Sequence, residues 1–326
     1  MIRRDVSSFA TRHRHRCVAL VRFRDECRSR KFSARSSRRE ATRLSIVPTS
    51  ASLDTSSAAG VDMLEPPAQL QPSLTVDGIT INVPSLPEAV SSIVSAAQHG
   101  DNFSVCTLNL DHVVQLQHHA NFRAAYRRAR FVTADGFPIV VLSRLMGVRI
   151  ERTTGADLVE PVCAEARKKG LPVFLLGAND LTLKLTARRL SERFKGLQIA
   201  GCFAPGPGFD PYSSEADAAI ERIRASGARL CFVALGAPRQ ELFAARCLDE
   251  LDGTGVLCIG AALDFIAGTQ SRAPSIARRT GLEWAWRMLR EPRRLGPRYI
   301  KCMTIVPRLV ARTIPQIVQA RMRKAA

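Results

Sequence analysis

From Ser73 onward, short apolar runs alternate with segments whose apolar residues recur at helical spacing. Residues 74–83 alternate apolar and polar side chains around Asp77-Gly78, which is typical of a β-hairpin. The apolar runs predict strands at 103–108, 131–134, 172–177, 198–203, 229–236, 256–259 and 262–265. Helical spacing predicts helices at 87–97, 113–129, 139–146, 158–169, 181–194 and 215–225, and another after Glu241.

This order of elements predicts an α/β fold. Strands that alternate with helices of roughly 10–15 residues favour a Rossmann-like, doubly wound and mainly parallel sheet with helices on both faces. In such a sheet, ligands bind beyond the carboxyl ends of the strands. Polar residues follow the predicted strands at 103–108 and 131–134, and we therefore expect the chemistry at their shared edge.

The pattern changes after Arg272, where the chain predicts a basic helical appendage interrupted by Pro292, Pro297, Pro307 and Pro315. Apolar residues recur at three- and four-residue spacing at Ile305, Val306, Leu309, Val310, Ile314, Ile317 and Val318. Basic residues fall among or after them at Arg308, Arg312, Arg321, Arg323 and Lys324. This pattern favours a helix that lies on an anionic bilayer. The alternative is a helix that packs on its own domain or on a second subunit.

Residues 1–62 are rich first in Arg and Ser and then in Ser, Thr, Ala and Pro. With little apolar periodicity, this segment is predicted to be a disordered extension. An organellar transit peptide and a translation start at Met63 are two other interpretations. The predicted organisation is thus an extension at 1–62, an α/β domain at 63–271 and a membrane-associating basic appendage at 272–326.

The net charge of +19 belongs to the two ends of the chain. Residues 1–44 contain 14 Lys and Arg against 4 Asp and Glu, and residues 272–326 contain 14 against 2. The middle, 45–271, contains 20 against 23 and is close to neutral. Basic ends suit an anionic partner, either a phospholipid surface or a nucleic acid.

Nine cysteines are scattered without a CxxC pair and without metal-type spacing to the six histidines. Cys106, Cys231 and Cys258 fall within predicted strands and are expected to be buried. This usage indicates a reducing compartment and predicts no metal site. No run approaches the roughly 20 apolar residues of a membrane-spanning helix.

Thr107, Asn109 and His112 follow one predicted strand, and Asp135 follows the next. A carboxylate at the end of a strand, backed by a glycine turn, is well placed to act as a general base. The alternative is that Asp135 only caps the helix near Pro138. Thr107 and Asn109 could bind a sugar hydroxyl or a phosphate, or stabilise a turn. His112 is more typical of a helix entry than of a catalyst.

Two glycine turns precede predicted helices. The segment 236–241, Gly-Ala-Pro-Arg-Gln-Glu, places backbone N–H groups at a helix N-terminus, which favours phosphate. Gly155-Ala156-Asp157 could be a similar cradle, with Asp157 as an ordinary N-cap as the alternative. Neither segment matches GxGxxG or a Walker sequence, and no DxD metal motif occurs in the chain.

Taken in order, these segments resemble the WecG/TagA/CpsF glycosyltransferase family. The resemblance covers roughly 225 residues, from Leu74 to Arg298, and the ordered set is far more specific than any one segment. The matching segments are 107–112 (TLNLDH), 134–138 (ADGFP), 152–158 (RTTGADL), 173–177 (VFLLG), 236–241 (GAPRQE), 260–268 (GAALDFIAG), 272–274 (RAP) and parts of 281–294 (GLEW, R, REPRR).

The resemblance implies an inverting, metal-independent transferase without a cofactor, which moves a sugar from a UDP-sugar to a polyprenyl-diphosphate-linked sugar. It implies Asp135 as the base, assisted by Thr107 and Asn109, and the 236–241 segment as the site for uridine diphosphate. The C-terminal arginines are expected to close over the site and to contact the membrane and the diphosphate. The implied substrate-binding residues are Gly155, Asp157, Gly177, Gly236, Pro238, Gln240, Glu241, Asp264, Arg287, Arg290, Arg293 and Arg294.

The implied role is in bacterial exopolysaccharide or cell-surface polysaccharide synthesis, by a cytoplasmic protein held peripherally at the inner face of the plasma membrane. A donor of the N-acetylmannosamine type is the family's commonest theme, with glucose or glucuronic acid close behind. The expected partners are the UDP-sugar, the lipid-linked acceptor and an anionic membrane, but no nucleic acid. Homo-oligomerisation is left open.

Two other classes of function are compatible with parts of the sequence. A non-enzymatic, basic nucleotide- or nucleic-acid-binding α/β module would bind nucleic acid in a salt-sensitive way. The nearly neutral middle of the chain counts against it. A nucleotide-dependent oxidoreductase is disfavoured because the glycine fingerprint and its following acidic residue are missing.

Overall fold

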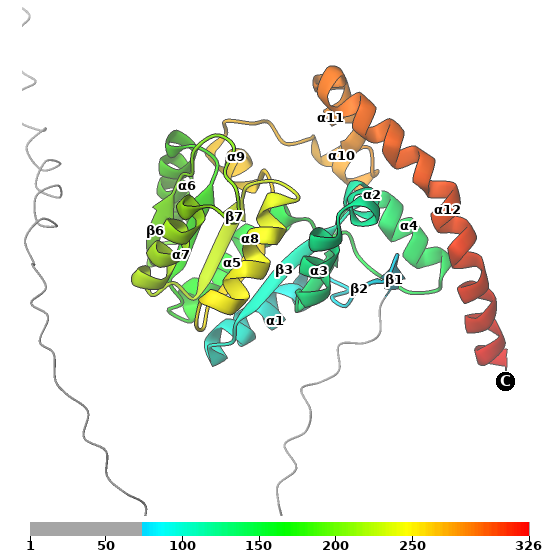
Figure 1. The fold of residues 1–326 in the computed structure, drawn as a ribbon, viewed down its shortest axis with the longest axis horizontal. Helices are drawn as coiled ribbons and strands as arrows, with labels where there is room; N and C mark the ends of the chain where they lie inside the picture. Colours follow the sequence, from blue (N-terminus) through cyan, green and yellow to red (C-terminus); the bar gives the residue numbers. More distant parts are fainter. Residues whose placement is uncertain (1–73, 326) are drawn as a thin grey trace, which may run out of the picture. The chain divides into compact units, whose positions relative to one another are not determined.

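Six parallel strands form the central sheet of this computed structural model (Figure 1). The structure describes residues 74–325, except for the side chains of 278, 279, 294, 310 and 312–325, so the predicted extension at 1–62 lies outside it. The strand order is β4-β3-β8-β7-β5-β6. The strands are β3 (Phe103–Leu108), β4 (Phe131–Ala134), β5 (Val173–Gly177), β6 (Ile199–Phe203), β7 (Leu230–Ala234) and β8 (Gly255–Cys258). A separate hairpin pairs β1 (Leu74–Val76) with β2 (Ile79–Ile81), as predicted.

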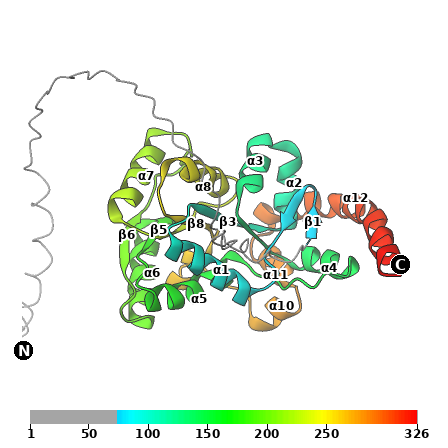
Figure 2. The ribbon, with the colours of Figure 1, turned by 90° about the horizontal axis from the view of Figure 1, so that it is seen from below.

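Helices cover both faces of the sheet, which confirms the predicted α/β class (Figure 2). One core contains side chains of α1 (Leu86–His99), α5 (Gly155–Lys168), α6 (Asp180–Arg193) and α9 (Ala262–Ala267). The other contains side chains of α2 (Leu110–His118), α3 (Ala120–Arg128), α4 (Phe137–Leu145), α7 (Ser214–Ser226) and α8 (Arg239–Glu250). Alternate residues of a strand enter opposite cores, because the side chains of a strand point to opposite faces. In β3, for example, Val105 joins the first core and Cys106 the second.

The carboxyl ends of β3 and β4 meet at one edge of the sheet. The two strands pair in parallel with Leu108 opposite Ala134, and the Asp135 N–H donates to the Leu108 carbonyl over 2.8 Å. Strand β3 lies between β4 and β8 in the sheet. The chain leaves β3 for α2 on one face, whereas it leaves β8 for α9 on the opposite face. A point where neighbouring connections leave to opposite faces is the usual ligand crevice of an open α/β sheet. The predicted site edge is therefore present.

The single helix predicted at 113–129 is wrong, because the chain forms two helices, α2 and α3. His119 has an extended backbone and ends α2 where α3 begins. The break allows α3 to fold back, so that the rings of Phe122 and Tyr126 lie 5.8 and 6.1 Å from the His112 ring. In one straight helix Tyr126 would be about 21 Å along the axis from His112. Tertiary packing of α3 thus overrides the local helical pattern.

The strand predicted at 262–265 is also wrong, since these residues belong to helix α9. Gly260, with φ +57°, turns the chain after β8, and Leu263 becomes fully buried on the face that α6 also covers. A short apolar run fits a buried helix as well as a strand, so its period could not decide between them.

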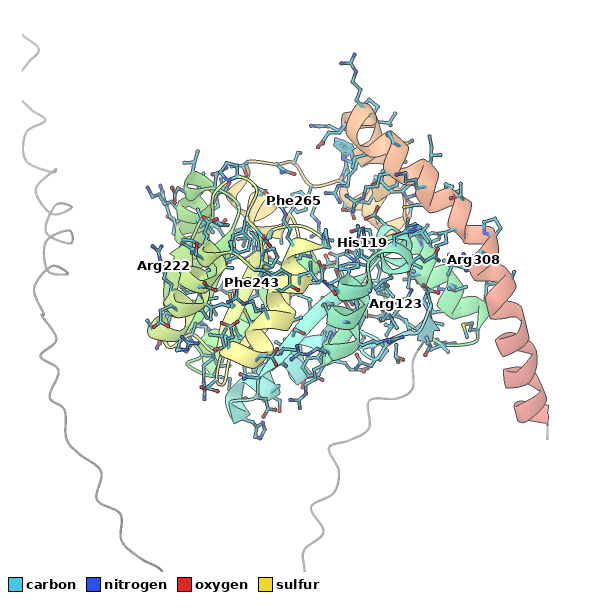
Figure 3. The ribbon with its side chains drawn as sticks, viewed as in Figure 1. His119, Arg123, Arg222, Phe243, Phe265 and Arg308 are labelled. Carbon is cyan, nitrogen blue, oxygen red and sulfur yellow. The ribbon has the colours of Figure 1, made fainter. Side chains whose placement is uncertain are left out.

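Phe209 anchors the Pro/Gly loop at 204–212, whose role the sequence did not reveal. Its ring is buried and packs edge to face on Phe243 of α8, with centroids 5.6 Å apart. Phe243 is labelled in Figure 3. The Gly206 N–H donates to the Glu215 carboxylate over 2.7 Å. The loop is thereby fixed to α7 and α8.

Three helices form the C-terminal segment: α10 (Ser275–Arg279), α11 (Glu283–Arg290) and α12 (Pro292–Ala325). The expected interruptions after Pro292 are absent, because α12 continues through three further prolines. A proline inside a helix loses one hydrogen bond and bends the helix without having to end it. Cys302, Ile305 and Leu309 are buried in the core that α2 also enters. For these residues, the alternative of packing on the protein's own domain is confirmed; the side chains of 312–325 lie outside the described part.

Candidate active site

Asp135 directly follows β4, at the edge of the sheet where the carboxyl ends of β3 and β4 meet. The Thr107 hydroxyl on the neighbouring strand donates to its Oδ2 over 3.4 Å. Gly136, with φ +112°, then turns the chain into α4, and it lies beside Asn109, since an added Cβ would come within 3.9 Å of the Asn109 Cβ. The alternative in which Asp135 caps α4 is wrong, because Gly136 occupies the N-cap position and no side chain bonds there. The structure therefore brings Asp135, Thr107 and Asn109 together.

The Asp135 carboxyl has the electrostatics of a base that works near neutral pH. Burial, reinforced by the negative charge of Glu283, raises its pKa to about 6, while Arg152 and Arg287 oppose the rise. A general base is most effective when its pKa lies near the working pH, because it is then both ionised and basic enough to take a proton. Glu283 and Arg287 come from α11, so the C-terminal segment helps to set this pKa.

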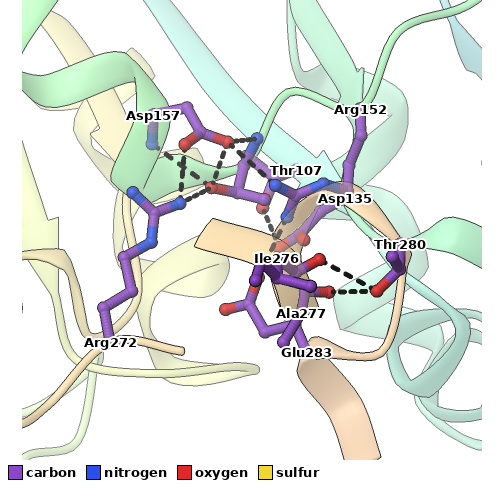
Figure 4. Close-up of polar contacts among 10 residues, drawn as sticks. Thr107, Asp135, Arg152, Asp157, Arg272, Ile276, Ala277, Thr280 and Glu283 are labelled. Carbon is purple, nitrogen blue, oxygen red and sulfur yellow. Dashed lines mark hydrogen bonds and ion pairs between the residues drawn. The ribbon is translucent and has the colours of Figure 1, made fainter. Parts of the chain in front are cut away.

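An ion-pair network fastens the C-terminal segment to the site edge (Figure 4). Arg152 Nη1 lies 3.0 Å from Glu283 Oε2 at the start of α11, and its Nη2 lies 3.9 Å from Asp157 Oδ2. Arg272 Nη2 contacts the other oxygen of Asp157 over 2.6 Å. Burial opposes ionisation of Asp157, but the Arg272 guanidinium and the hydrogen bonds from Thr154 together outweigh burial and lower the Asp157 pKa. These partly buried pairs hold α11 beside Asp135.

Asp157 and Gly155 are engaged in contacts within the protein. Thr154 is the N-cap of α5, and its hydroxyl and the Asp157 carboxylate form a reciprocal capping box, so Asp157 is not itself the N-cap. A Cβ on Gly155 would come within 2.6 Å of the Ile259 backbone. Gly155 is therefore required for the close approach of α5 to the end of β8. Both residues shape the edge from the side of α5.

Gln240 and Glu241 are buried beneath the edge, with 3% and 1% of their surfaces exposed. The Gln240 amide N–H donates to Glu241 Oε1 over 2.8 Å, and its oxygen accepts from the Gly260 N–H over 3.1 Å. Gln240 thereby links the first turn of α8 to the loop after β8. Burial raises the pKa of Glu241 to about 7. These two side chains support the loops, whereas Gly236, at φ +72°, has open space on its Cβ side.

Pro238, Gly177 and Asp264 complete the part of the edge near β5, β7 and β8. Pro238 occupies the N-cap position of α8. A Cβ on Gly177 would overlap the Ala234 carbonyl at the end of β7, so only glycine fits there. Asp264 Oδ1 accepts from the Thr182 hydroxyl over 3.3 Å and ties α9 to α6.

Arg287 and Arg290 line a cavity of about 230 Å³ between α11 and the loop that follows α9. Phe265 of α9 forms part of its wall (Figure 3). The Arg290 guanidinium stacks over the Trp286 ring, with its Cζ 4.1 Å from the centroid. The other lining residues are Thr269, Gln270, Ser271, Ala273 and Glu291. Arg293 is exposed on α12 and does not line this cavity, and the Arg294 side chain lies outside the described part.

The sequence pattern assigned no role to Arg152, Arg272 or Glu283. Arg152 and Arg272 each begin one of the motif-like segments, which is the signal that could have singled them out. Glu283 also lies in one of these segments, 281–284, but its pairing with Arg152 could not be foreseen because 131 positions of the chain separate the two residues. Among the described residues, no group of three or more His, Cys, Asp or Glu side chains could hold a metal ion. The metal independence of the reaction stays a prediction.

One comparison with known proteins identifies a family to which nearly all of the described residues can be matched. Residues 74–321 match the model of the glycosyl transferase WecG/TagA/CpsF family. The match includes every residue predicted for the site, and it covers the C-terminal segment as well as the sheet. The match favours the glycosyltransferase interpretation over the two alternatives, an oxidoreductase and a non-enzymatic binding module. The chain therefore belongs to the WecG/TagA/CpsF family of glycosyltransferases, enzymes of polysaccharide biosynthesis that use sugar nucleotides and lipid-linked acceptors.

Proposed function

We propose that this protein is an inverting glycosyltransferase that moves a hexose from a UDP-sugar to a polyprenyl-diphosphate-linked sugar. The observation that carries the proposal is the Asp135 carboxyl, which lies at the sheet edge beside Thr107 with a pKa of about 6. A carboxylate of this kind is suited to deprotonate a sugar hydroxyl as it becomes a nucleophile. The proposed donor is of the N-acetylmannosamine type, with glucose or glucuronic acid as the alternatives.

In the proposed reaction, the acceptor hydroxyl attacks the anomeric carbon of the donor from the face opposite UDP. Asp135 takes the hydroxyl proton as the new C–O bond forms, and the bond between the anomeric carbon and the UDP oxygen breaks. One displacement inverts the configuration at that carbon. The Thr107 hydroxyl, 3.4 Å from Asp135 Oδ2, and the Asn109 amide would orient the base and the acceptor.

Departure of UDP requires positive charge, because negative charge develops on the diphosphate in the transition state. Arg287 and Arg290 on α11 are proposed to supply part of it, since guanidinium groups bind phosphate oxygens in a bidentate way. The backbone of Gly236 and the N-terminus of α8 would hold the uridine diphosphate. This arrangement requires no metal ion.

The C-terminal segment is also proposed to hold the enzyme at an anionic membrane surface, where a lipid-linked acceptor resides. In the described part of the chain, no helix is long and apolar enough to cross a bilayer. The support comes instead from exposed apolar and exposed basic side chains in the same C-terminal segment, a combination that favours an interfacial position. The apolar set is Ile276, Leu289, Ile300 and Met303, and the basic set is Arg293, Lys301 and Arg308.

The test is a UDP-release assay that screens UDP-sugars against a short-chain polyprenyl-diphosphate sugar in detergent, with and without EDTA. We expect release that requires both substrates, survives EDTA and is lost in Asp135→Asn. The product's anomeric configuration, measured by NMR, should be opposite to that of the donor. Folded protein that gives no release with any pair, or a product with retained configuration, would contradict the proposal.

A further inference from the structure

A buried histidine and a buried tyrosine lie directly behind Thr107 and Asn109. His112 in α2 and Tyr126 in α3 are 5% and 1% exposed. The Tyr126 hydroxyl lies 2.7 Å from His112 Nδ1, and each of these atoms lies 2.9 Å from the Thr107 carbonyl oxygen. On the other side of the ring, His112 Nε2 lies 3.4 Å from the Asn109 amide nitrogen. The pair therefore contacts both residues that flank the proposed base.

Donor and acceptor roles in this cluster leave one tautomer for the histidine. A carbonyl oxygen can only accept, so His112 Nδ1 carries the hydrogen that it donates to Thr107. Nε2 then has a lone pair and accepts from the Asn109 amide N–H. The Asn109 oxygen accepts from the His112 backbone N–H over 3.0 Å. Both ends of the Asn109 amide are thus held, and its second N–H remains for a ligand at the edge.

The charges around His112 agree with a neutral ring. Burial lowers its pKa to about 4, while Asp111 on the same helix and the Thr107 carbonyl raise it, and Arg298 from α12 lowers it. Tyr126, on α3, has a raised pKa because it is buried, and it stays a neutral hydroxyl. Phe122 packs edge to face on the imidazole. Both ring nitrogens face Thr107 or Asn109, so His112 is placed to position these neighbours and not to take the proton of the acceptor.

We propose that His112 and Tyr126 are positioning residues that fix the Thr107 backbone and the Asn109 amide at the transfer site. The inference rests on the proposed function of Asp135, Thr107 and Asn109. An apolar pair would fill the same buried space without the cost of desolvating an imidazole and a phenol hydroxyl. What the polar pair adds is a defined orientation of two groups next to the base. Misplacement of such groups by about 1 Å can slow an enzyme by about 100-fold.

Steady-state kinetics of three variants test this positioning. Tyr126→Phe removes one hydroxyl, His112→Leu removes both ring nitrogens, and His112→Gln keeps one N–H donor and one oxygen acceptor. We expect kcat to fall about 10-fold in Tyr126→Phe and about 100-fold in His112→Leu, with KM for the UDP-sugar changed less than about threefold. His112→Gln should recover part of the loss.

Thr254→Val is the matched control. The buried Thr254 hydroxyl donates to the Ala228 carbonyl over 2.9 Å, and Thr254 lies just before β8, at the amino ends of the strands and away from the proposed site. It should leave kcat unchanged, and the Tm of each variant separates folding from turnover. Unchanged kcat in folded His112→Leu, or equal losses in Leu and Gln, would overturn the inference.

A second measurement is independent of turnover. Imidazole ¹⁵N shifts, assigned by loss of the signal in His112→Gln, report the tautomer and charge of His112 directly. We expect the neutral Nδ1–H form from pH 7 down to about pH 5. A charged ring at pH 6, or the Nε2–H tautomer, would overturn the inference whatever the kinetics. If the wild type releases no UDP with any sugar pair, the proposed function fails instead. The shifts still decide whether His112 has the tautomer that accepts a hydrogen bond from Asn109.

Discussion

Replacement of Asp135 by Asn should make the protein more stable while it stops turnover. The Asn side chain has nearly the same shape and keeps an oxygen that can accept from the Thr107 hydroxyl, which lies 3.4 Å from Oδ2 in the native protein. The substitution removes the negative charge that burial penalises. Loss of a general base should lower kcat by between about 10²- and 10⁴-fold.

The gain in stability follows from the pKa, which burial raises from the usual 3.8 to about 6. Below pH 3.8 the carboxyl is protonated in both the folded and the unfolded state, so the substitution changes nothing. Between pH 3.8 and about 6 the unfolded chain loses this proton while the folded state keeps it, so native stability falls; above pH 6 both states are ionised and the difference stays constant. The difference from Asn grows to about 1.5 kcal/mol at pH 5 and about 3 kcal/mol at pH 8.

Thermal and urea unfolding of both proteins at pH 5 and pH 8 would measure this difference. At pH 8, Asp135→Asn should raise Tm by roughly 6–12 °C. Asp249→Asn is the matched control, because the hydrogen bond from Arg128 lowers the Asp249 pKa, and its loss should not stabilise the protein. Equal stability of Asp135→Asn and wild type at pH 8, or a gain that shrinks as pH rises, would refute the reasoning.

Three other substitutions examine the C-terminal segment. Glu283→Gln removes a charge that raises the Asp135 pKa, so the acidic limb of the pH–kcat profile should move to lower pH; an unmoved limb would contradict this electrostatic role. Gly281→Ala should lower the unfolding free energy by about 1–3 kcal/mol in urea titrations, because φ is +77° and the new Cβ would overlap the Phe137 ring. Ile300→Asp should weaken sedimentation with anionic vesicles at unchanged Tm, since Ile300 is 68% exposed.

Matched controls separate the causes in these experiments. Gly147→Ala has a similar φ, +73°, but no atom within 4 Å of the added Cβ, so it reports backbone strain alone. A loss in Gly281→Ala no greater than in Gly147→Ala would show that the Phe137 contact does not matter. Vesicles of neutral lipid control for charge, and equal vesicle binding by Ile300→Asp and wild type would exclude this residue from the membrane surface.

The sequence by itself determined the alternation of strands and helices and the edge where the chemistry lies. Apolar period is a local property, and parallel strands joined by crossovers bring their carboxyl ends to one edge without further information. That is why Thr107, Asn109 and Asp135 could be predicted as neighbours although 28 residues separate the first from the last. The basic, amphipathic character of the tail is equally local.

Only the tertiary structure decided how these groups are held and charged. The break at His119 depends on the packing of α3 against His112, and the helix at 262–267 depends on burial on the face that α6 also covers. The pKa of Asp135 depends on Glu283 and on burial, which involve residues far apart in the chain. Local pattern records which residues are apolar or polar, whereas desolvation and ion pairing depend on distances in space. The chemistry of the edge is therefore a property of the folded chain.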